Sequence, residues 1–249
     1  MNSGIMSALK KLGLTGASST LEVRLQEASA NRLGHGEFLE LLLRDEINIR
    51  SDRGVARRIK AACFPSAKPL DDFNWEFNAS INKRQIFDLA SCDFVRKARN
   101  VLFIGPPGVG KSCLSQAIGL QAIRMGMTVY YRSVFDLARD FRMEEESCFE
   151  DRTLKRYLSC DLLIVDDMGI RQLPARAGEY LFEVIMRRHE KRASIMTSNR
   201  PIEEWGKLIG DVPTAGAILD RFLQNAEMVN IIGTSYRLKD KAREKAKEK

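Results

Sequence analysis

The glycine-rich stretch GPPGVGKS, residues 105–112, constrains the fold of this chain more than any other feature. Through Gly105, Gly110, Lys111 and Ser112 it matches the pattern G-x-x-x-x-G-K-[ST]. Glycines let backbone N–H groups converge on phosphate oxygens without a clash from Cβ. The apolar residues NVLFI precede the stretch as an expected strand, and KSCLSQAIGLQAIRMG follows it as an expected helix. The positive end of that helix points at the same anion, so the stretch predicts a loop that holds nucleotide phosphates.

Each residue type in the loop has a part in this chemistry. Lys111 is expected to reach the β- and γ-phosphates, and the Ser112 hydroxyl to bind Mg²⁺. A glycine-rich turn that binds nothing is the alternative, and the flanking strand and helix argue against it. The residues expected to bind ATP in this region are Gly105, Pro106, Pro107, Gly108, Val109, Gly110, Lys111, Ser112 and Cys113.

Five short apolar stretches read as buried strands that alternate with longer stretches of helical character. The strands are expected at residues 100–105, 128–133, 161–167, 193–199 and 227–232. Helices are expected between them, for example at residues 111–125 and 175–192. Strands that alternate with helices form parallel sheets with helices on both faces. The predicted fold class is therefore α/β, with a five-stranded parallel sheet.

Polar side chains follow two of these strands. Asp166 and Asp167 end the stretch LLIVDD, at the carboxyl end of a strand, where ligands bind in α/β sheets. Asp166 is the candidate that holds Mg²⁺ with Ser112, usually through water. Asp167 is the candidate that polarises the attacking water. The alternative is that Asp167 only caps a turn, because the usual residue in this role is glutamate, which is one methylene longer.

The next strand ends in IMTSNR, and its Asn199 is a candidate for the γ-phosphate or for orienting water. A strand-end turn before Pro201 is the alternative. Arg221, in AILDRFLQ, is the candidate for an arginine that acts on the nucleotide of a neighbouring subunit. A local ion pair with the adjacent aspartate is the alternative there. Arg237, in GTSYRL, is a weaker candidate of the same kind.

The region before the expected sheet has a different sequence pattern, with helical periodicity and no short apolar strands. Residues 20–63 read as helices with short breaks, and CFPSAKPLDDFNWEFN reads as a linker because it lacks helical periodicity. One helical face is expected to carry a row of cations, Arg50, Arg53, Arg57 and Lys60, because they are spaced three, four and three residues apart. Such a row suits salt-sensitive contacts to DNA phosphates, and a solvated face is the alternative.

Composition limits the classes of protein that fit. The net charge of +7 favours a polyanionic partner without proving one. No apolar run approaches the length of a membrane span, and the N-terminus has no apolar run of signal-peptide length. The five cysteines form no C-x-x-C pair, and there are only two histidines. A zinc site or disulfide framework is therefore not expected, and the cytoplasm is the expected location.

The order GPPGVGKS, LLIVDD, TSNR, LDRF, GTSYR resembles the AAA+ ATPases of the initiator and loader group. The chain looks most like the IstB-type helper ATPases of bacterial transposition, with DnaC-type helicase loaders close behind. The resemblance covers nearly the whole chain. It includes the N-terminal phrase EFLELLLRDEINIRSDRGVARRIKAACFP and the later phrases LFEVIMRRHEKRASIMTSNRPIEEW and ILDRFLQNAEMVNIIGTSYRLK.

The resemblance implies an ATPase that binds ATP and Mg²⁺ and completes its site between subunits. By this resemblance Asp166 is the Walker B residue, Asp167 the catalytic carboxylate, Asn199 sensor 1 and Arg221 the trans-acting arginine. About 17 residues follow the last expected strand, so a full helical lid is not expected. This puts a sensor 2 role for Arg237 in doubt.

The expected organisation has four parts. A helical domain for DNA binding or oligomerisation covers residues 1–66, a linker 67–80, the AAA+ ATPase domain 81–239 and a charged tail 240–249. In the initiator group, an extra helical element between the second and third strands faces the central channel. The resemblance therefore implies a second DNA-contact zone here, with a solvated face of mixed charge as the alternative. Its candidates are Arg139, Arg142, Arg152, Lys155 and Arg156.

The function implied is a bacterial helper that forms oligomers on duplex DNA with ATP, remodels the DNA and recruits and stimulates a partner transposase. A DnaC-like replicative helicase loader is the main alternative. It would need an N-terminal segment that grips a helicase, whereas this one reads as compact, basic and helical. A small-molecule kinase with a phosphate-binding loop is the other alternative. The basic N-terminal segment and the TSNR phrase count against it.

Overall fold

The computed structural model describes residues 3–147, 152–174 and 176–236. The chain divides into two compact units, residues 1–58 and residues 59–249. The division falls within one continuous helix, α3 (His35–Ala62). Arg237, the charged tail and the expected absence of a lid concern residues that lie outside this description.

The first unit consists of α1 (Ser3–Lys11), α2 (Thr15–Asn31) and most of α3. Its small core contains Ala17, Leu21 and Leu42. The buried Glu46 carboxylate accepts hydrogen bonds from the backbone N–H groups of Gly16 (2.6 Å) and Ala17 (3.0 Å), and so satisfies free donors at the start of α2. A side chain at position 16 would meet the α3 backbone, because a Cβ there would lie 2.8 Å from Glu46 Cα.

The second unit is built around a five-stranded sheet, as the sequence predicted. The strands are β1 (Asn100–Ile104), β2 (Val129–Ser133), β3 (Leu162–Met168), β4 (Ala193–Ser198) and β5 (Ala226–Asn230). They run parallel in the order β2-β3-β4-β1-β5. Because β1 lies beside β4, the loop that follows β1 opens next to the ends of β3 and β4, where ligands bind in such sheets.

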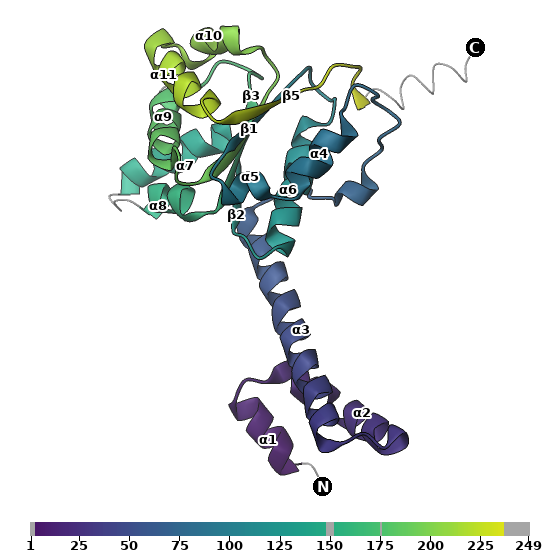
Figure 1. Ribbon diagram of the computed structural model, residues 1–249. Coiled ribbons are helices and arrows are strands. Elements are labelled where there is room, and N and C mark those ends of the chain that lie inside the picture. The colour runs from purple at the N-terminus through teal and green to yellow at the C-terminus, as the bar shows by residue number, and fades with distance from the viewer. Residues whose placement is uncertain (1–2, 148–151, 175, 237–249) are drawn as a thin grey trace, which may run out of the picture. The chain divides into compact units, whose positions relative to one another are not determined.

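Helices cover both faces of the sheet (Figure 1). One face carries α6 (Lys111–Arg124), with α4 (Lys83–Ala90) packed against it, and α5 (Asp93–Arg96) lies beside β4. The other face carries α7 (Val134–Ser147), α8 (Arg152–Ser159), α9 (Ala177–Arg188), α10 (Trp205–Ile209) and α11 (Val212–Leu223). Two short 3₁₀ helices, η1 (Leu70–Asp72) and η2 (Ile202–Glu204), complete the described elements of this unit.

Close packing of α6 fixes the position of the phosphate loop relative to the sheet. Gly119, in the middle of this helix, leaves room for Ile164 and Phe64, since a Cβ at 119 would lie 2.9 Å from each of these side chains. Every residue from Leu114 to Leu120 is buried. The start of α6 is therefore held firmly above the end of β1.

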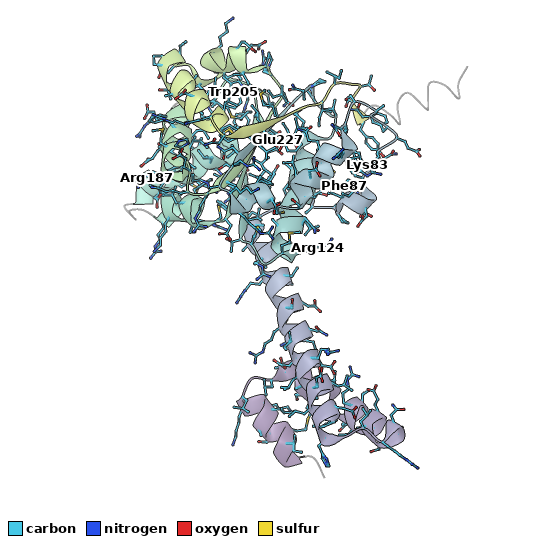
Figure 2. All side chains as sticks on the ribbon, viewed as in Figure 1. Lys83, Phe87, Arg124, Arg187, Trp205 and Glu227 are labelled. Carbon is cyan, nitrogen blue, oxygen red and sulfur yellow. The ribbon has the colours of Figure 1, made fainter. Side chains whose placement is uncertain are left out.

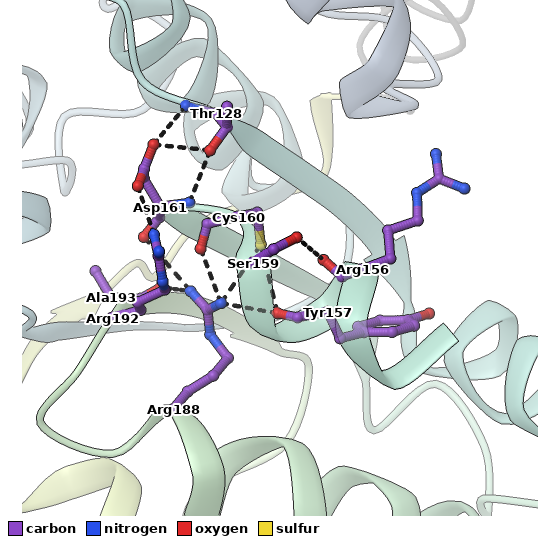
Figure 3. A network of polar contacts seen from close by, with 9 residues as sticks. All are labelled: Thr128, Arg156, Tyr157, Ser159, Cys160, Asp161, Arg188, Arg192 and Ala193. Atoms are coloured by element: carbon purple, nitrogen blue, oxygen red, sulfur yellow. Dashed lines mark hydrogen bonds and ion pairs between the residues drawn. The ribbon is translucent and has the colours of Figure 1, made fainter. Parts of the chain in front are cut away.

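A buried arginine ties together the opposite end of the sheet (Figure 3). Arg188, the last residue of α9, is 2% exposed. Its guanidinium donates to the carbonyls of Tyr157 (2.8 Å) and Cys160 (3.0 Å), to the Ala193 carbonyl and to the Ser194 hydroxyl (3.1 Å). Burial lowers the pKa of Arg188. This one side chain joins α8, the start of β3 and the start of β4.

We expect Arg188→Met to destabilise the protein by about 2–4 kcal/mol, because it leaves several buried carbonyls without donors. Arg187→Met is the matched control, since the neighbouring Arg187 side chain is 54% exposed and pairs with Glu183. That change should alter stability by less than about 0.5 kcal/mol. Urea unfolding of both variants measures the difference. Equal stability of the two variants would contradict the structural role of Arg188.

Candidate functional site

The phosphate loop lies between β1 and α6 and has the backbone that its glycines allow. Gly108 and Gly110 have φ values of 81° and 107°, in the left-handed region that side chains disfavour. A Cβ at Gly110 would also crowd the Phe73 ring, at 3.1 Å. Gly110 precedes the first residue of α6, and no described side chain caps that helix. Its first N–H groups are therefore available to an anion.

Lys111 is folded into the loop rather than extended into solvent. It is 5% exposed, and its ammonium donates to the carbonyls of Gly105 (2.7 Å) and Pro106 (2.8 Å). It also donates to Asn199 Oδ1 at 2.5 Å. The structure thus joins two residues that the sequence placed 88 positions apart, the loop lysine and the sensor candidate.

Asp166, at the end of β3, accepts hydrogen bonds on both of its carboxylate oxygens. Its Oδ1 accepts from the Ser112 hydroxyl (2.9 Å), the Asp167 N–H (2.9 Å) and the Thr197 hydroxyl. Its Oδ2 accepts from the Tyr131 hydroxyl at 2.5 Å. Burial, followed by the charge of Asp166, raises the pKa of Tyr131, so this hydroxyl remains a donor. The Asp166 side chain is therefore fixed at the N-terminal end of α6, beside Ser112.

Tyr131 and Thr197 are parts of this site that the sequence reasoning missed. They lie on β2 and β4, the two strands that flank β3. The available signal was a polar side chain near the end of each neighbouring strand. It becomes informative only when the strand order is known.

Asp167 lies beyond the regular part of β3. The pairing of β3 with β4 is irregular between Val165 and Met168, and Asp167 has a φ of 67°. Its N–H contacts the Thr197 hydroxyl at 3.2 Å, and the residue lines the pocket described next. Such irregularities turn a side chain away from the pattern of the strand. The carboxylate is thereby placed on the pocket wall.

A pocket of about 840 Å³ extends from the phosphate loop. Of the predicted nucleotide and catalytic residues, it is lined by Pro107, Gly108, Val109, Gly110, Lys111, Ser112, Cys113, Asp167 and Asn199. Asp166 adjoins it through Ser112, and Gly105 and Pro106 through Lys111. Burial raises the pKa of the Cys113 thiol. The sequence reasoning did not identify a further group of lining residues, Lys68, Asp72, Asn74, Phe77, Asn78, Gly169, Ile170, Arg200, Pro201, Glu204 and Tyr236.

The segment interpreted as a linker forms one wall of this pocket. Ser66 N–H donates to Gln116 of α6 at 3.3 Å, and Leu70 is buried. The Trp75 ring lies 4.9 Å from the Phe73 ring and stacks on Phe87 of α4 at 5.5 Å. The Lys83 ammonium lies over the Trp75 ring at 5.4 Å, and Figure 2 shows Lys83 and Phe87 together on α4. This segment is thus packed against the pocket and the two helices α4 and α6.

Arg221 lies outside the pocket of its own chain. It is on α11, with 45% of its side chain exposed and its Nε 4.0 Å from Asp220. Arg200 is the described cation that lines the pocket in addition to Lys68 and Lys111. Arg200 donates to the Gly169 carbonyl (3.1 Å) and pairs with Glu204 (2.7 Å).

The two rows of candidate DNA contacts are exposed. Arg50, Arg53, Arg57 and Lys60 are all exposed on α3, as are Arg139, Arg142, Arg152, Lys155 and Arg156 on α7 and α8. Several of these side chains already have partners. Arg50 pairs with Glu46 at 2.5 Å, and Arg53 donates to the Thr15 hydroxyl. In the second row, Arg139 pairs with Asp136 at 2.6 Å, and Arg156 lies 4.4 Å from the Tyr130 ring.

Among the described residues, no group of three or more histidine, cysteine, aspartate or glutamate side chains is placed to hold a metal ion. Within the same residues, no helix has both the length and the apolar character needed to cross a membrane.

The sheet order, the phosphate loop and the position of Asp166 beside Ser112 together define an α/β nucleotide-binding protein with a phosphate-binding loop. The chain belongs to the family described as IstB-like ATP binding protein, which it matches over residues 7–244.

Relatives in insertion sequences support this assignment. One relative is a protein of insertion sequence IS5376 from Geobacillus stearothermophilus that is named for ATP binding. The two chains are 36% identical over 222 residues, and the match covers 89% of this chain and 88% of the relative. It is 34% identical over 233 residues to the corresponding protein of IS21 from Pseudomonas aeruginosa, covering 94% and 88%. The chain is therefore an ATP-binding protein of this family.

Solved structures share the fold. The DnaC helicase loader matches with a TM-score of 0.54 and 20% identity, covering 70% of this chain and 98% of that chain. AMPPCP-bound DnaA from Aquifex aeolicus matches with a TM-score of 0.56 and 21% identity, covering 75% and 57%. These similarities confirm the predicted fold class.

Proposed function

We propose that this chain hydrolyses ATP in oligomers that form on duplex DNA in the bacterial cytoplasm. It remodels that DNA and recruits and stimulates a separate transposase. The observation that carries the proposal is that Lys111, Ser112 and Asn199 line one pocket, whereas the candidate arginine Arg221 lies outside it. Similarity to insertion-sequence proteins supports the link with transposition.

The residues near Asp166 suit Mg²⁺. The Ser112 hydroxyl and the Asp166 carboxylate lie 2.9 Å apart, and both are hard oxygen ligands of the kind this ion prefers. When bound, the ion would neutralise charge on the phosphate oxygens. We propose that Ser112 and Asp166 hold it, and that Tyr131 and Thr197 keep the carboxylate in place.

The reaction itself is assigned to three side chains. We propose that Asp167 accepts a proton from the attacking water and that Asn199 orients this water or the γ-phosphate. The backbone irregularity at Asp167 brings its shorter side chain to the pocket wall, which supports this role. Lys111 exchanges its bonds to the loop carbonyls for phosphate oxygens when ATP binds. Arg221 of a neighbouring subunit completes the site, so that ATP favours oligomers and hydrolysis releases them.

DNA is the proposed template for this oligomer. The exposed cations of α3 and those of α7 and α8 are proposed to contact DNA phosphates without reading bases. A helicase loader remains the second candidate, because the DnaC loader has the same fold. Pulldowns with a transposase and with the replicative helicase distinguish these two candidates.

The proposed function is tested by measuring size and DNA binding together. Light scattering and electron microscopy are performed with and without ATP and duplex DNA. We expect large assemblies only when both ligands are present. A monomer that is indifferent to DNA would contradict the proposal and favour a protein client or a small-molecule substrate.

Charge reversal within the same experiment tests the DNA contact. Arg53→Glu combined with Arg57→Glu should weaken DNA binding by about tenfold or more, reduce its salt dependence, and leave ATP binding unchanged. Arg44→Glu is the control on the same helix, because Arg44 lies outside the row and pairs with Glu40. Thermal melting of both proteins checks the fold, since Arg53 also contacts Thr15. Unchanged DNA affinity in the double variant would remove the α3 row from the interface.

A further inference from the structure

Asn78 carries an unsatisfied hydrogen-bond donor in the wall of the ATP pocket. The residue lines the pocket and is 8% exposed. Its Oδ1 accepts from Ser80 N–H (3.1 Å) and from the Ser80 hydroxyl (2.8 Å). Its Nδ2 is buried and has no hydrogen-bond partner among the described residues. An unpaired buried donor is costly, so it calls for an explanation.

The orientation of this amide is fixed by its surroundings. A backbone N–H can only donate, so the atom that faces Ser80 N–H must be the oxygen. Gly233 packs against the amide, because a Cβ at 233 would lie 3.0 Å from both Nδ2 and Oδ1. The Ser80 hydroxyl shares its single proton between Asn78 Oδ1 and the Ile232 carbonyl, and it accepts from Ile232 N–H at 3.2 Å. The donor is therefore held in one position before any ligand binds.

Asn78 lies at the aromatic part of the pocket. Phe73, Phe77 and Tyr236 line this part, and the Phe77 and Tyr236 rings meet edge to face at 4.8 Å. Tyr236 N–H donates to the Gly108 carbonyl at 2.9 Å, which links this part to the phosphate loop. Aromatic rings suit the flat faces of a nucleobase. A nucleotide with its phosphates on the loop would extend its base toward these rings.

We propose that Asn78 is a specificity-determining residue whose Nδ2 donates a hydrogen bond to a ring nitrogen of adenine. Adenine offers N1, N3 and N7 as acceptors, which is what a fixed donor requires. The proposal rests on the proposed function in taking ATP as the nucleotide that is hydrolysed. Its test uses nucleotide binding alone, so a failure of assembly, DNA binding or hydrolysis leaves the test intact.

The decisive variant is Asn78→Asp. The aspartate keeps an oxygen for Ser80 N–H and the Ser80 hydroxyl but replaces the buried donor with an acceptor. We expect ATP affinity, measured by calorimetry, to fall by about tenfold or more. Asn74→Asp is the matched control. Asn74 lines the same pocket but is exposed, and its Oδ1 accepts from Phe77 N–H at 3.2 Å. It adds the same charge without removing a buried donor, so a loss below about threefold is expected.

Nucleotide analogues identify the acceptor. 1-Deaza-, 3-deaza- and 7-deaza-ATP each lack one ring nitrogen. We expect one of them to bind the wild-type protein about tenfold more weakly than ATP, and to bind Asn78→Asp no more weakly than ATP does. Loss with 1-deaza-ATP would mean that the contact also excludes GTP, whose N1 is a donor. Equal losses in Asn78→Asp and Asn74→Asp, or full binding of all three analogues, would overturn the proposal. Melting curves confirm that both variants are folded.

Discussion

Lys111→Ala is expected to lower ATP affinity by at least about a hundredfold and to abolish ATP-dependent assembly on DNA. In the structure the ammonium is buried against the Gly105 and Pro106 carbonyls and Asn199, all at the edge of the pocket. It is the one cation that both the loop and the sensor candidate contact directly among the described residues. Its loss therefore removes the charge-assisted donor to the phosphates and a contact that positions Asn199.

Calorimetry with ATP and light scattering with ATP and duplex DNA measure the two effects. Lys191→Ala is the control, because this exposed lysine lies outside the ATP pocket. Circular dichroism shows whether Lys111→Ala is folded, which matters because the lysine also bonds to the loop. Normal assembly by a folded Lys111→Ala protein would remove the nucleotide from the mechanism.

The sheet and the phosphate loop were predictable because their signals are local. Each strand is a short apolar run, and the loop needs glycine at positions such as 108 and 110, where φ is positive. The alternation of strands and helices predicted the α/β class. The polar residues at the C-terminal ends of β3 and β4 identified Asp166, Asp167 and Asn199 as site candidates. The structure places these residues close to Lys111 and Ser112, where the sequence expected the nucleotide.

The aromatic wall was not predictable by the same means. Residues 63–78 have no helical period, and their structure depends on contacts with α4 and α6. A signal was nevertheless present, because Phe73, Trp75 and Phe77 alternate with polar residues. The partners of Asp166 were missed for a different reason. Tyr131 and Thr197 meet it only because β2 and β4 flank β3, and a sequence does not reveal the order of strands in a sheet.

The cation rows show where helical periodicity stops being informative. It correctly placed Arg50, Arg53 and Arg57 on exposed positions of α3. It did not show that Arg50 pairs with Glu46, whose carboxylate also binds the start of α2. A DNA phosphate would compete with that internal partner. Arg57, for which the described residues provide no such pair, is the stronger candidate for a direct phosphate contact.

Arg221→Ala should bind ATP normally and hydrolyse it about a thousandfold more slowly, if the arginine stabilises the charge of the transition state in a neighbouring subunit. Its exposed position on α11 and its weak 4.0 Å approach to Asp220 leave it available for this contact. The alternative within one chain is Arg200, which lines the pocket but is held by Gly169 and Glu204. ATP turnover by Arg221→Ala and Arg200→Ala is therefore measured side by side.

Mixing two inactive variants distinguishes the two arrangements. Asp167→Asn should bind ATP and hydrolyse it slowly while still offering Arg221 to its neighbour. Mixed with Arg221→Ala, it should restore about a quarter of wild-type turnover at equal proportions, because one in about four random interfaces joins an intact Asp167 to an intact Arg221. Arg200→Ala mixed with Asp167→Asn should not recover turnover if Arg200 acts on the nucleotide of its own chain, because every site in that mixture then lacks one of the two residues. Recovery requires that the arginine of one subunit reaches the nucleotide of another. If both proteins are folded and bind ATP but their mixture is inactive, Arg221 does not act on a neighbouring subunit. That outcome would also contradict the proposal that hydrolysis depends on the oligomer.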